Sequence, residues 1–488
     1  MARRKRRDGR QWGAGMGTIS SAMSITSGAL DADQEALNII SNNVANANTT
    51  GYTEEVANWR ENSSVTINGV SYGQGVTDTG ATSVRDKVLT ERLDQQQQLE
   101  SASSTRLTAL DSIQSLFTPA SSTSTSGDIG TDITSFYDSF SKLEAQPTNS
   151  SDRQAVLSAA STLAADISGA ASNLESQKSS LDQEAGGVTS QVNALTTSIA
   201  QLNQQIMSTS PDSDAGTLED QRQADITALS KLVGINQIST ENNGVSITTT
   251  SGALLVSEGQ SYQMTNGTVD GETHFYVGTT DITSGLTTGG GELGGYLTAR
   301  DTDVPSALSS LDQLAYGIST SVNALNNTGT DADGNTGTAA SPLYIFNEPT
   351  AVTGSAENMS VVMTDPNEIA AASSTEGTGG GSNATAMYNL AKSTSAELNG
   401  QTPSDYYSSF VSSLGSTVSE VKTENTAQTA SVTQLTSQIN TLSGVNENDE
   451  ASSLTTIERS YEAASKVFTI LNSIMASALN LGEQTTVS

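Results

Sequence analysis

The sequence predicts a mainly α-helical protein with β-rich segments inserted in the middle of the chain. Apolar residues recur every seven positions near both ends, and longer stretches with the same period lie between them. Thr- and Gly-rich stretches with short β-branched runs separate the inner helices. The 488 residues exceed what one core usually supports, so several domains are expected. An apolar fraction of 34% and an aromatic fraction of 4% favour thin helical bundles, whose narrow cores need few large side chains.

A stretch near the N-terminus has the apolar face of a helix that ends in a defined turn. Its seven-residue series is Met23, Leu30, Leu37 and Val44, and the polar Thr26 and Asp33 interrupt the same face. We expect the exit turn after this helix to be set by Asn42, Asn43, Asn46, Gly51 and Tyr52. Asparagine tolerates the left-handed conformation that ends helices, and glycine adopts positive φ without strain. The alternative is an ordinary helix C-terminus followed by a loop.

The other end of the chain carries a more regular heptad pattern. Two seven-residue series, offset by three positions, predict a coiled-coil face made of Leu454, Ile457, Tyr461, Phe468, Leu471 and Met475. A helix with one apolar stripe needs a partner, so we expect the two terminal helices to pair as a coiled coil. Residues 16–60 and 445–488 would then form one terminal domain.

Four inner stretches with helical period predict a long-helix bundle. These stretches are 84–117, 151–207, 304–325 and 404–442. The second contains Gly186 and Gly187, which are either tolerated within one helix or mark a corner between two. The run 94–98 is polar on all sides, which predicts a solvated or interhelical polar stretch. The bundle domain would comprise residues 61–235, 292–328 and 385–444.

Short β-branched runs between glycines and asparagines predict one or more β-rich outer domains. They would comprise residues 236–291 and 329–384, with expected strands at 245–248, 273–277, 343–346 and 359–363. Weak alternation also predicts short strands within 56–72, directly after the exit turn.

The composition excludes several classes of function. A net charge of −32 disfavours nucleic acid and anionic membrane surfaces as partners. No apolar run approaches the ~18 residues of a membrane helix, so no membrane insertion is expected. The chain has no cysteine and a single histidine, His274, in a strand-like run, so thiolate sites and Ser-His-Asp or Cys-His arrangements lack support. We expect His274 to be a satisfied or exposed strand residue and the protein to be no enzyme, with no cofactor.

One segment, from Asp331 to Gly337, resembles a calcium loop because acidic and amide oxygens alternate along it. Its glycine stands at the fourth rather than the sixth position, and Pro342 occupies the place of the bidentate glutamate. A plain turn is therefore favoured, and calcium binding is the alternative.

Several motifs together resemble a known family. A helix that runs into Asn-Asn-Val-Ala-Asn-x-x-Thr-x-Gly-Tyr, at 42–52, resembles the axial proteins of the bacterial flagellum, which are the rod, hook and hook-associated proteins. The segments 443–446, 449–450 and 458–464 are similar to the hook-associated protein 1 family. Four internal segments agree with that family, namely 75–93, 218–234, 291–300 and 365–370. The likeness covers nearly the whole chain from about Met16. The Asn-rich turn alone indicates the class, and the combination indicates the member.

The resemblance implies a structural protein that forms the junction between hook and filament by axial self-assembly. The assembly interface would be the seams Met23, Leu30 and Leu37 with the C-terminal face. Implied partners are further copies in a ring, hook protein below, the second junction protein above, and an export chaperone on the C-terminal helix. The protein would be extracellular, in the flagellum, after type III export without a cleaved signal peptide. Alternatives are hook protein or flagellin and, outside the class, a secreted adhesin or glycosidase with a helical stalk.

The first fifteen residues differ from the rest of the chain. They carry the basic cluster 3–7 and are predicted to be a non-helical extension, either not native or outside the family, with Met16 as the start. The basic residues are followed by Gln11-Trp12-Gly13-Ala14-Gly15 rather than an apolar segment, so no signal peptide is predicted. A nuclear-type signal or an RNA-binding arm is the alternative.

Overall fold

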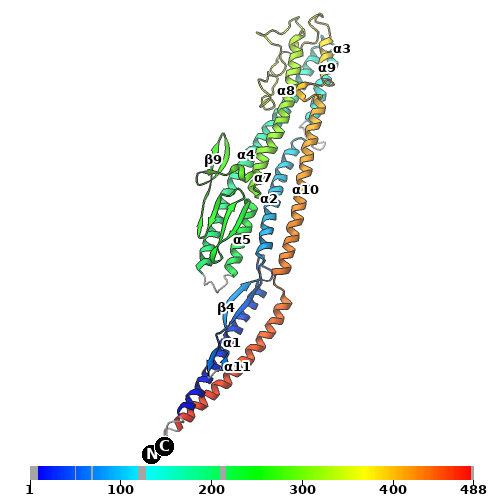
Figure 1. The fold of residues 1–488 in the computed structure, drawn as a ribbon. Helices are drawn as coiled ribbons and strands as arrows, with labels where there is room; N and C mark the ends of the chain where they lie inside the picture. The colour runs from blue at the N-terminus through cyan, green and yellow to red at the C-terminus, as the bar shows by residue number, and fades with distance from the viewer. Residues whose placement is uncertain (1–8, 50, 68–69, 119–127, 209–215, 485–488) are drawn as a thin grey trace, which may run out of the picture.

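The molecule is elongated, with both chain ends at one tip (Figure 1). The structure is a computed structural model that describes residues 9–49, 51–67, 70–118, 128–208 and 216–484. We call the part that holds the two end helices and the strands up to Ser83 the terminal unit, and everything between Val84 and Ser443 the body. A β-rich domain lies at the side of the body, and irregular loops lie at its far tip (Figure 1).

The terminal unit is a helix pair with a β-hairpin against it. Helices α1 (Gly9–Asn46) and α11 (Glu447–Gln484) pack against each other, which confirms the predicted pairing of the ends. Strand β1 (Glu55–Glu61) pairs antiparallel with β4 (Val76–Ser83), and both pack on α1. Between them, β2 (Val65–Ile67) pairs with β3 (Val70–Tyr72). These are the short strands expected after the exit turn.

The start of α1 corrects one expectation. Because the helix begins at Gly9, the stretch from Gly9 to Gly15 is helical and the prediction of a non-helical 1–15 is wrong there. Residues 1–8 lie outside the described part of the chain.

The four predicted inner helices are present. They are α2 (Lys87–Ser115), α4 (Ser150–Ser208), α8 (Val304–Thr328) and α10 (Pro403–Ser443). Helix α4 runs for 59 residues, and the pair Gly186 and Gly187 lies inside it, so the pair is tolerated within one helix. Further helices are α3 (Ile129–Ala145), α5 (Gly216–Leu232), α6 (Thr283–Thr287), α7 (Gly291–Thr298) and α9 (Ser382–Leu390).

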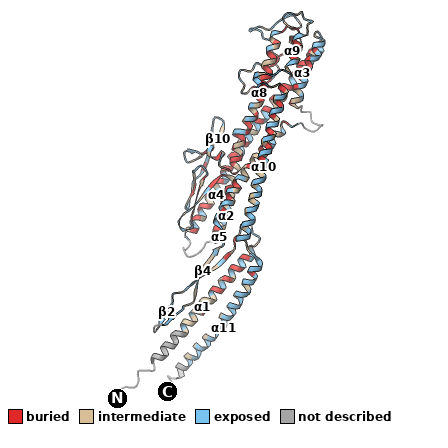
Figure 2. Cartoon of the chain, turned by 45° about the vertical axis from the view of Figure 1, so that its right-hand side comes forward, coloured by how far each residue is buried: buried red, intermediate tan, exposed pale blue. Residues whose placement is uncertain are grey.

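Helix α3 supplies the aromatic centre of the body's core. Its side chains Ile129, Ile133, Phe136, Phe140 and Leu143 recur at helical spacing and are buried where α3 packs against α4, α9 and α10. Phe136 meets Phe140 edge to face at a centroid distance of 5.4 Å. This core lies towards the tip of the body away from the chain ends (Figure 2).

The polar run of α2 is interhelical rather than solvated. Asp94 is buried, and its carboxylate accepts hydrogen bonds from the side chains of Gln223, Thr227 and Gln237, each at 2.7 Å. Gln98 donates to the backbone carbonyl of Ile235 at 3.0 Å. The run therefore joins α2 to α5 and to the first strand of the β domain.

The β domain follows α5. Strands β5 (Ile235–Ser239), β6 (Val245–Thr249), β7 (Leu254–Ser257) and β8 (Gln260–Ser261) form an antiparallel sheet in that order. Strands β9 (Met264–Val269), β10 (Glu272–Val277) and β11 (Thr280–Asp281) form a second sheet with β10 in the middle. The Asn193 side chain of α4 bonds both the amide and the carbonyl of Met264, each at 2.8 Å, which ties the second sheet to α4.

The second predicted β-rich stretch, 329–384, has a different structure. It is mostly turns and loop, and of the expected strands only an isolated bridge between Phe346 and Val361 forms. Asn323 of α8 explains the difference, because its side-chain oxygen accepts from the amides of Ile345 and Phe346 and its amide donates to the Phe346 carbonyl. A helix side chain thus satisfies backbone groups that a neighbouring strand would otherwise pair.

The segment from Asp331 to Gly337 forms a compact turn at the same tip. The Asp331 carboxylate accepts from the amides of Asp333 at 2.8 Å and Asn335 at 2.7 Å, and Gly334 has a φ of +87°. These are the features of the plain turn expected there. Within the described residues, no group of three or more His, Cys, Asp or Glu side chains is placed to hold a metal ion.

Candidate functional site at the terminal helices and their exit turn

The exit turn after α1 is built by asparagine and glycine. The Asn46 side chain donates to Asn42 Oδ1 at 2.8 Å, and the Asn46 carbonyl accepts from the amide of Thr49 at 2.8 Å. The amide of Tyr52 then bonds the Thr49 carbonyl at 3.1 Å, and Gly51 adopts a φ of +83°. A side chain other than glycine would be strained at that φ, so the sequence turns the chain here instead of letting the helix fray.

Asn43 is the centre of the site. Its side chain is 1% exposed. Its amide nitrogen donates to the Glu55 carbonyl and to Glu450 Oε1, both at 2.8 Å. Its oxygen accepts from the Tyr52 hydroxyl at 2.8 Å and from the Glu55 amide at 3.0 Å. All four hydrogen-bonding positions of the amide are used, and they join α1, the exit turn, β1 and α11.

Negative charge gathers around this amide. Burial raises the pKa of Tyr52 to about 12, with Glu55, Glu450 and Glu54 adding to the effect. Burial, and then the charges of Glu450 and Asp449, raise the pKa of Glu54. Burial also raises the pKa of Glu450, and its hydrogen bond from Asn43 opposes that shift. The carboxyls therefore disfavour one another's ionisation, and Asn43 offsets part of this cost at Glu450.

The terminal unit joins the body where three chain segments cross. The amide of Glu54 donates to the Ser443 carbonyl at 2.9 Å, and the amide of Val84 donates to the Glu54 carbonyl at 2.9 Å. The Ser443 hydroxyl closes the set by donating to the Val84 carbonyl at 3.1 Å. Sequence reasoning gave neither Ser443 nor Glu450 a role. Their only signal was their place in the segment 443–450, which carried the family resemblance.

On α1, the most buried positions are not those of the predicted series. Met23, Leu30 and Leu37 are half-buried, and Val44 is 46% exposed. The buried positions include Thr26 and Asp33, the two polar residues that interrupted the predicted stripe, together with Ala36, Ile40 and Asn43. One carboxylate oxygen of Asp33 is buried without a hydrogen-bond partner in the described residues.

Helix α11 is covered on one side only. Leu454, Ile457, Phe468, Leu471 and Met475 are half-buried, and Tyr461 is 38% exposed. Beside them a second row of large apolar side chains is exposed, namely Val467, Ile470, Ile474 and Leu479. Among residues 447–480, whose burial is described, only Glu450 is buried. Figure 2 shows α11 almost entirely in the colour of exposed residues.

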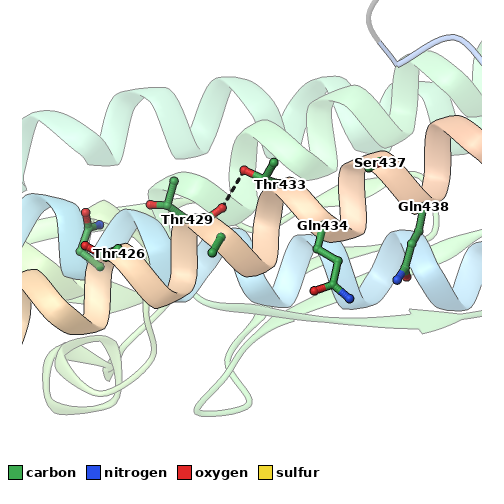
Figure 3. A pocket seen from close by; sticks show the side chains of 8 residues that line it. Thr426, Thr429, Thr433, Gln434, Ser437 and Gln438 are labelled. Atoms are coloured by element: carbon green, nitrogen blue, oxygen red, sulfur yellow. Dashed lines mark hydrogen bonds between the residues drawn. The ribbon is translucent and has the colours of Figure 1, made fainter.

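A groove of about 750 Å³ lies along the C-terminal half of α10 (Figure 3). Its lining is Asn425, Thr426, Thr429, Ala430, Thr433, Gln434, Ser437 and Gln438. These side chains offer amides and hydroxyls without a carboxylate, imidazole or basic group, so the groove presents no general acid or base.

His274 lies in β10, and its Nδ1 is 2.7 Å from Asp281 Oδ2. This contact and hydrogen bonds from Thr283 lower the pKa of Asp281 to about 2. The histidine is thus a strand residue paired with a carboxylate, as the sequence predicted. Among the described helices, none combines the length and the apolar character that crossing a membrane requires.

The molecule is thus an elongated body carried on a pair of end helices, whose apolar side chains are left partly uncovered in the single chain. Residues 23–53 match the flagella basal body rod protein family, and residues 437–481 match the C-terminal region of the flagellar basal body rod FlgEFG proteins. Residues 110–340 match the helical domain of the flagellar hook-associated protein FlgK. The class is that of the axial proteins of the bacterial flagellum.

Whole-chain comparisons show similarity to one protein of this class. Flagellar hook-associated protein 1 of Salmonella typhimurium strain LT2 is 27% identical, over 95% of this chain and 100% of the relative. The proteins of the same name from Escherichia coli K12 and Bacillus subtilis 168 are each 25% identical, over 95% and 93% of this chain and 99% and 96% of the relatives. The solved flagellar hook junction protein FlgK from Burkholderia pseudomallei shares the fold, with a TM-score of 0.63 and 18% identity over 71% of this chain and 99% of that one.

Along nearly its whole length the chain is similar to flagellar hook-associated protein 1. It is a structural component of the hook–filament junction of the flagellum and not an enzyme. As a flagellar axial protein it is exported and assembles with other flagellar components.

Proposed function

We propose that the terminal unit is the element that builds this protein into the flagellum, with copies arranged as a ring in the axial structure. The observation that supports it is the incomplete cover of α11. Large apolar side chains on two neighbouring rows of this helix stay half-buried or exposed in the single chain, and Ile470 is 58% exposed. Contiguous exposed apolar surface on a protein of this kind is typical of an interaction site.

The free energies of side-chain burial favour end helices that become fully ordered only in contact with neighbouring copies. Full burial of one Leu or Phe side chain contributes about 1.5–3 kcal/mol, and a half-buried one contributes correspondingly less in the single chain. Isolated helices are marginal in water without tertiary packing. Each neighbouring copy that covers α11 would add burial, so folding of the ends and association stabilise each other.

The proposed interface keeps the predicted residues. They are Met23, Leu30 and Leu37 on α1, and Leu454, Ile457, Tyr461, Phe468, Leu471 and Met475 on α11. Asn42, Asn43, Asn46, Gly51 and Tyr52 would hold the exit turn. We extend the terminal domain of 16–60 and 445–488 through Ser83, because β4 packs on α1. The remaining division into bundle and outer domains, apart from the corrected 329–384, is part of the proposal.

The proposed partners are those that the family resemblance implies, and the uncovered apolar rows of α11 offer them a surface. Hook protein would contact one side of the ring and the second junction protein the other, and an export chaperone would cover the apolar rows of α11 before assembly. We propose an extracellular location in the flagellum.

The test is Phe468→Asp, which places a charge in an apolar contact that every copy repeats. We expect cells to build no filament and to release flagellin to the medium, while the purified body melts unchanged. Asn472→Asp, on an exposed position of the same helix, should leave filaments normal.

Secretion must be measured separately, because a chaperone would use the same face. A Phe468→Asp protein that is secreted, folds and still builds normal filaments would show that α11 is not the assembly element.

A further inference from the structure

Helix α5 belongs to the body but reaches the base of the terminal unit. It packs on α4 and α2, and near its start it also contacts β4. Gly216, its first residue, lies so close to Glu55 at the start of β1 that a Cβ there would overlap the carboxylate. The beginning of α5 is thus fitted against the hairpin formed by β1–β4.

Asp220 on α5 holds the residues that flank this hairpin. Its carboxylate accepts from the amide of Thr53 at 3.1 Å and from the Thr53 hydroxyl at 3.2 Å. It also forms an ion pair with Arg85. Thr53 stands two residues before β1 and Arg85 two residues after β4, so one carboxylate binds both ends of the hairpin.

Arg85 completes the network. Its guanidinium also donates to the Thr53 hydroxyl and to the Glu219 carbonyl, both at 3.1 Å. The side chains of Arg85 and Asp220 are only 10% and 11% exposed, so solvent and salt screen the pair far less than a surface pair. Charge-assisted hydrogen bonds of this kind are roughly twice as strong as neutral ones.

We propose that Asp220, Arg85 and Thr53 form a latch that fixes the orientation of the β1–β4 hairpin relative to the body. The three are positioning residues, and the exit turn and α1 follow the hairpin they hold. Every copy would then present its terminal unit at the same angle, which reduces the ordering cost of assembly. Because the latch lies within one chain, its test does not depend on whether the proposed ring forms.

The experiment measures the hairpin's orientation in the full-length monomer. The chain contains no cysteine, so Asn58→Cys on β1 and Gln201→Cys on α4, both exposed, give two specific spin-label sites. Double electron–electron resonance measures the distribution of distances between the two labels. This distribution should be narrow in the labelled protein without further substitutions. Asp220→Ala should broaden it at least about twofold, and Thr53→Val should broaden it less, because the ion pair remains.

Glu272→Ala is the matched control. It removes an ion pair of 2.7 Å with Lys178 inside the body and should leave the width unchanged. The thermal melting of the body should stay unchanged in Thr53→Val, which a purely stabilising role would not predict. If Asp220→Ala fails to fold, the width measured in Thr53→Val tests the latch by itself. An unchanged width in folded Thr53→Val protein, or equal broadening in Glu272→Ala, overturns the latch.

Discussion

The body and the terminal unit are both built on long helices with seven-residue periodicity, yet they bury that periodicity to different extents. On α4, the series Ala160, Ile167, Leu174 and Leu181 is buried by α3, α8 and their neighbours. On α11 an equally regular series is at most half-buried. In the body, the residues with this period are buried within one chain. At the chain ends, residues with the same period stay only partly buried. Under the proposed function, the body folds alone and the end helices become fully ordered only in contact with neighbouring copies.

Limited proteolysis of the dilute monomer gives the largest expected contrast. Because single-chain burial of α11 is incomplete, we expect protease to trim both ends, to about Tyr52 and from about Val445, and to leave the middle intact. Mass spectrometry of the products measures the boundaries. Full protection of both termini in dilute protein would contradict the expected difference in order between the body and the terminal unit. Protection of the termini only in assembled flagella would support it.

A matched pair of Phe→Ala variants tests the two cores. Phe136 is fully buried in the body, so Phe136→Ala should lower the free energy of unfolding by about 3–5 kcal/mol. Phe468 is half-buried on α11, so Phe468→Ala should change monomer stability far less. Urea denaturation followed by circular dichroism measures both. Equal losses would mean that α11 is packed as tightly as the body.

Two asparagines of the exit turn allow a smaller test. Asn43→Ala leaves hydrogen-bonding groups of Glu55, Tyr52 and Glu450 unpaired, at a cost of about 1–3 kcal/mol. Asn46→Ala removes bonds within the exit turn and should cost less. The temperature at which isolated flagella shed their filaments should therefore fall clearly in Asn43→Ala cells and little in Asn46→Ala cells. A larger fall in Asn46→Ala cells than in Asn43→Ala cells would show that Asn43 is not the central residue of the site.

The smallest expected effect is a pH dependence of the body's stability. Burial raises the pKa of Asp94 to about 6, opposed by its hydrogen bonds from Thr227, Gln237 and Gln223. Burial, and then the hydrogen bond and charge of Asp166, raise the pKa of Asp132 to about 7. The folded state binds these protons more tightly than the unfolded one. The stabilisation is thus complete below about pH 4 and is lost as pH rises through 6 to 7.

Lowering the pH from 7 to 5.5 should therefore stabilise the body by about 1 kcal/mol through Asp94. Urea denaturation at the two pH values measures the gain, and Asp94→Asn should reduce it. The control Asp405→Asn, at an exposed helix start, should leave it in place. A body that loses stability on this acidification would contradict the assignment.

Much of the fold was predictable because helix period and β-branched runs are local signals. The four long helices and the first β-rich stretch needed only spacing along the chain. Helix α3 was missed although it had a signal, since Ile129, Ile133, Phe136 and Phe140 stand at helical spacing behind the cap Asp128. The strand expected at 343–346 failed for a different reason, because Asn323 of the preceding helix α8 bonds the backbone groups of Ile345 and Phe346.

The sequence by itself determined the pairing of the ends, the Asn-rich exit turn and the absence of thiol chemistry, since each depends on residue type and near spacing. Only the tertiary structure decided which face of α1 is buried, because the packing of α11 and the β1–β4 hairpin against α1 buries Thr26 and Asp33 and leaves Met23 and Leu30 half-buried. It also decided that Asn43 meets Glu450, 407 residues along the chain, and that Thr53 meets Asp220, 167 residues along. A hydrogen bond between such distant residues leaves no periodicity or spacing in the sequence, so only the folded chain reveals it.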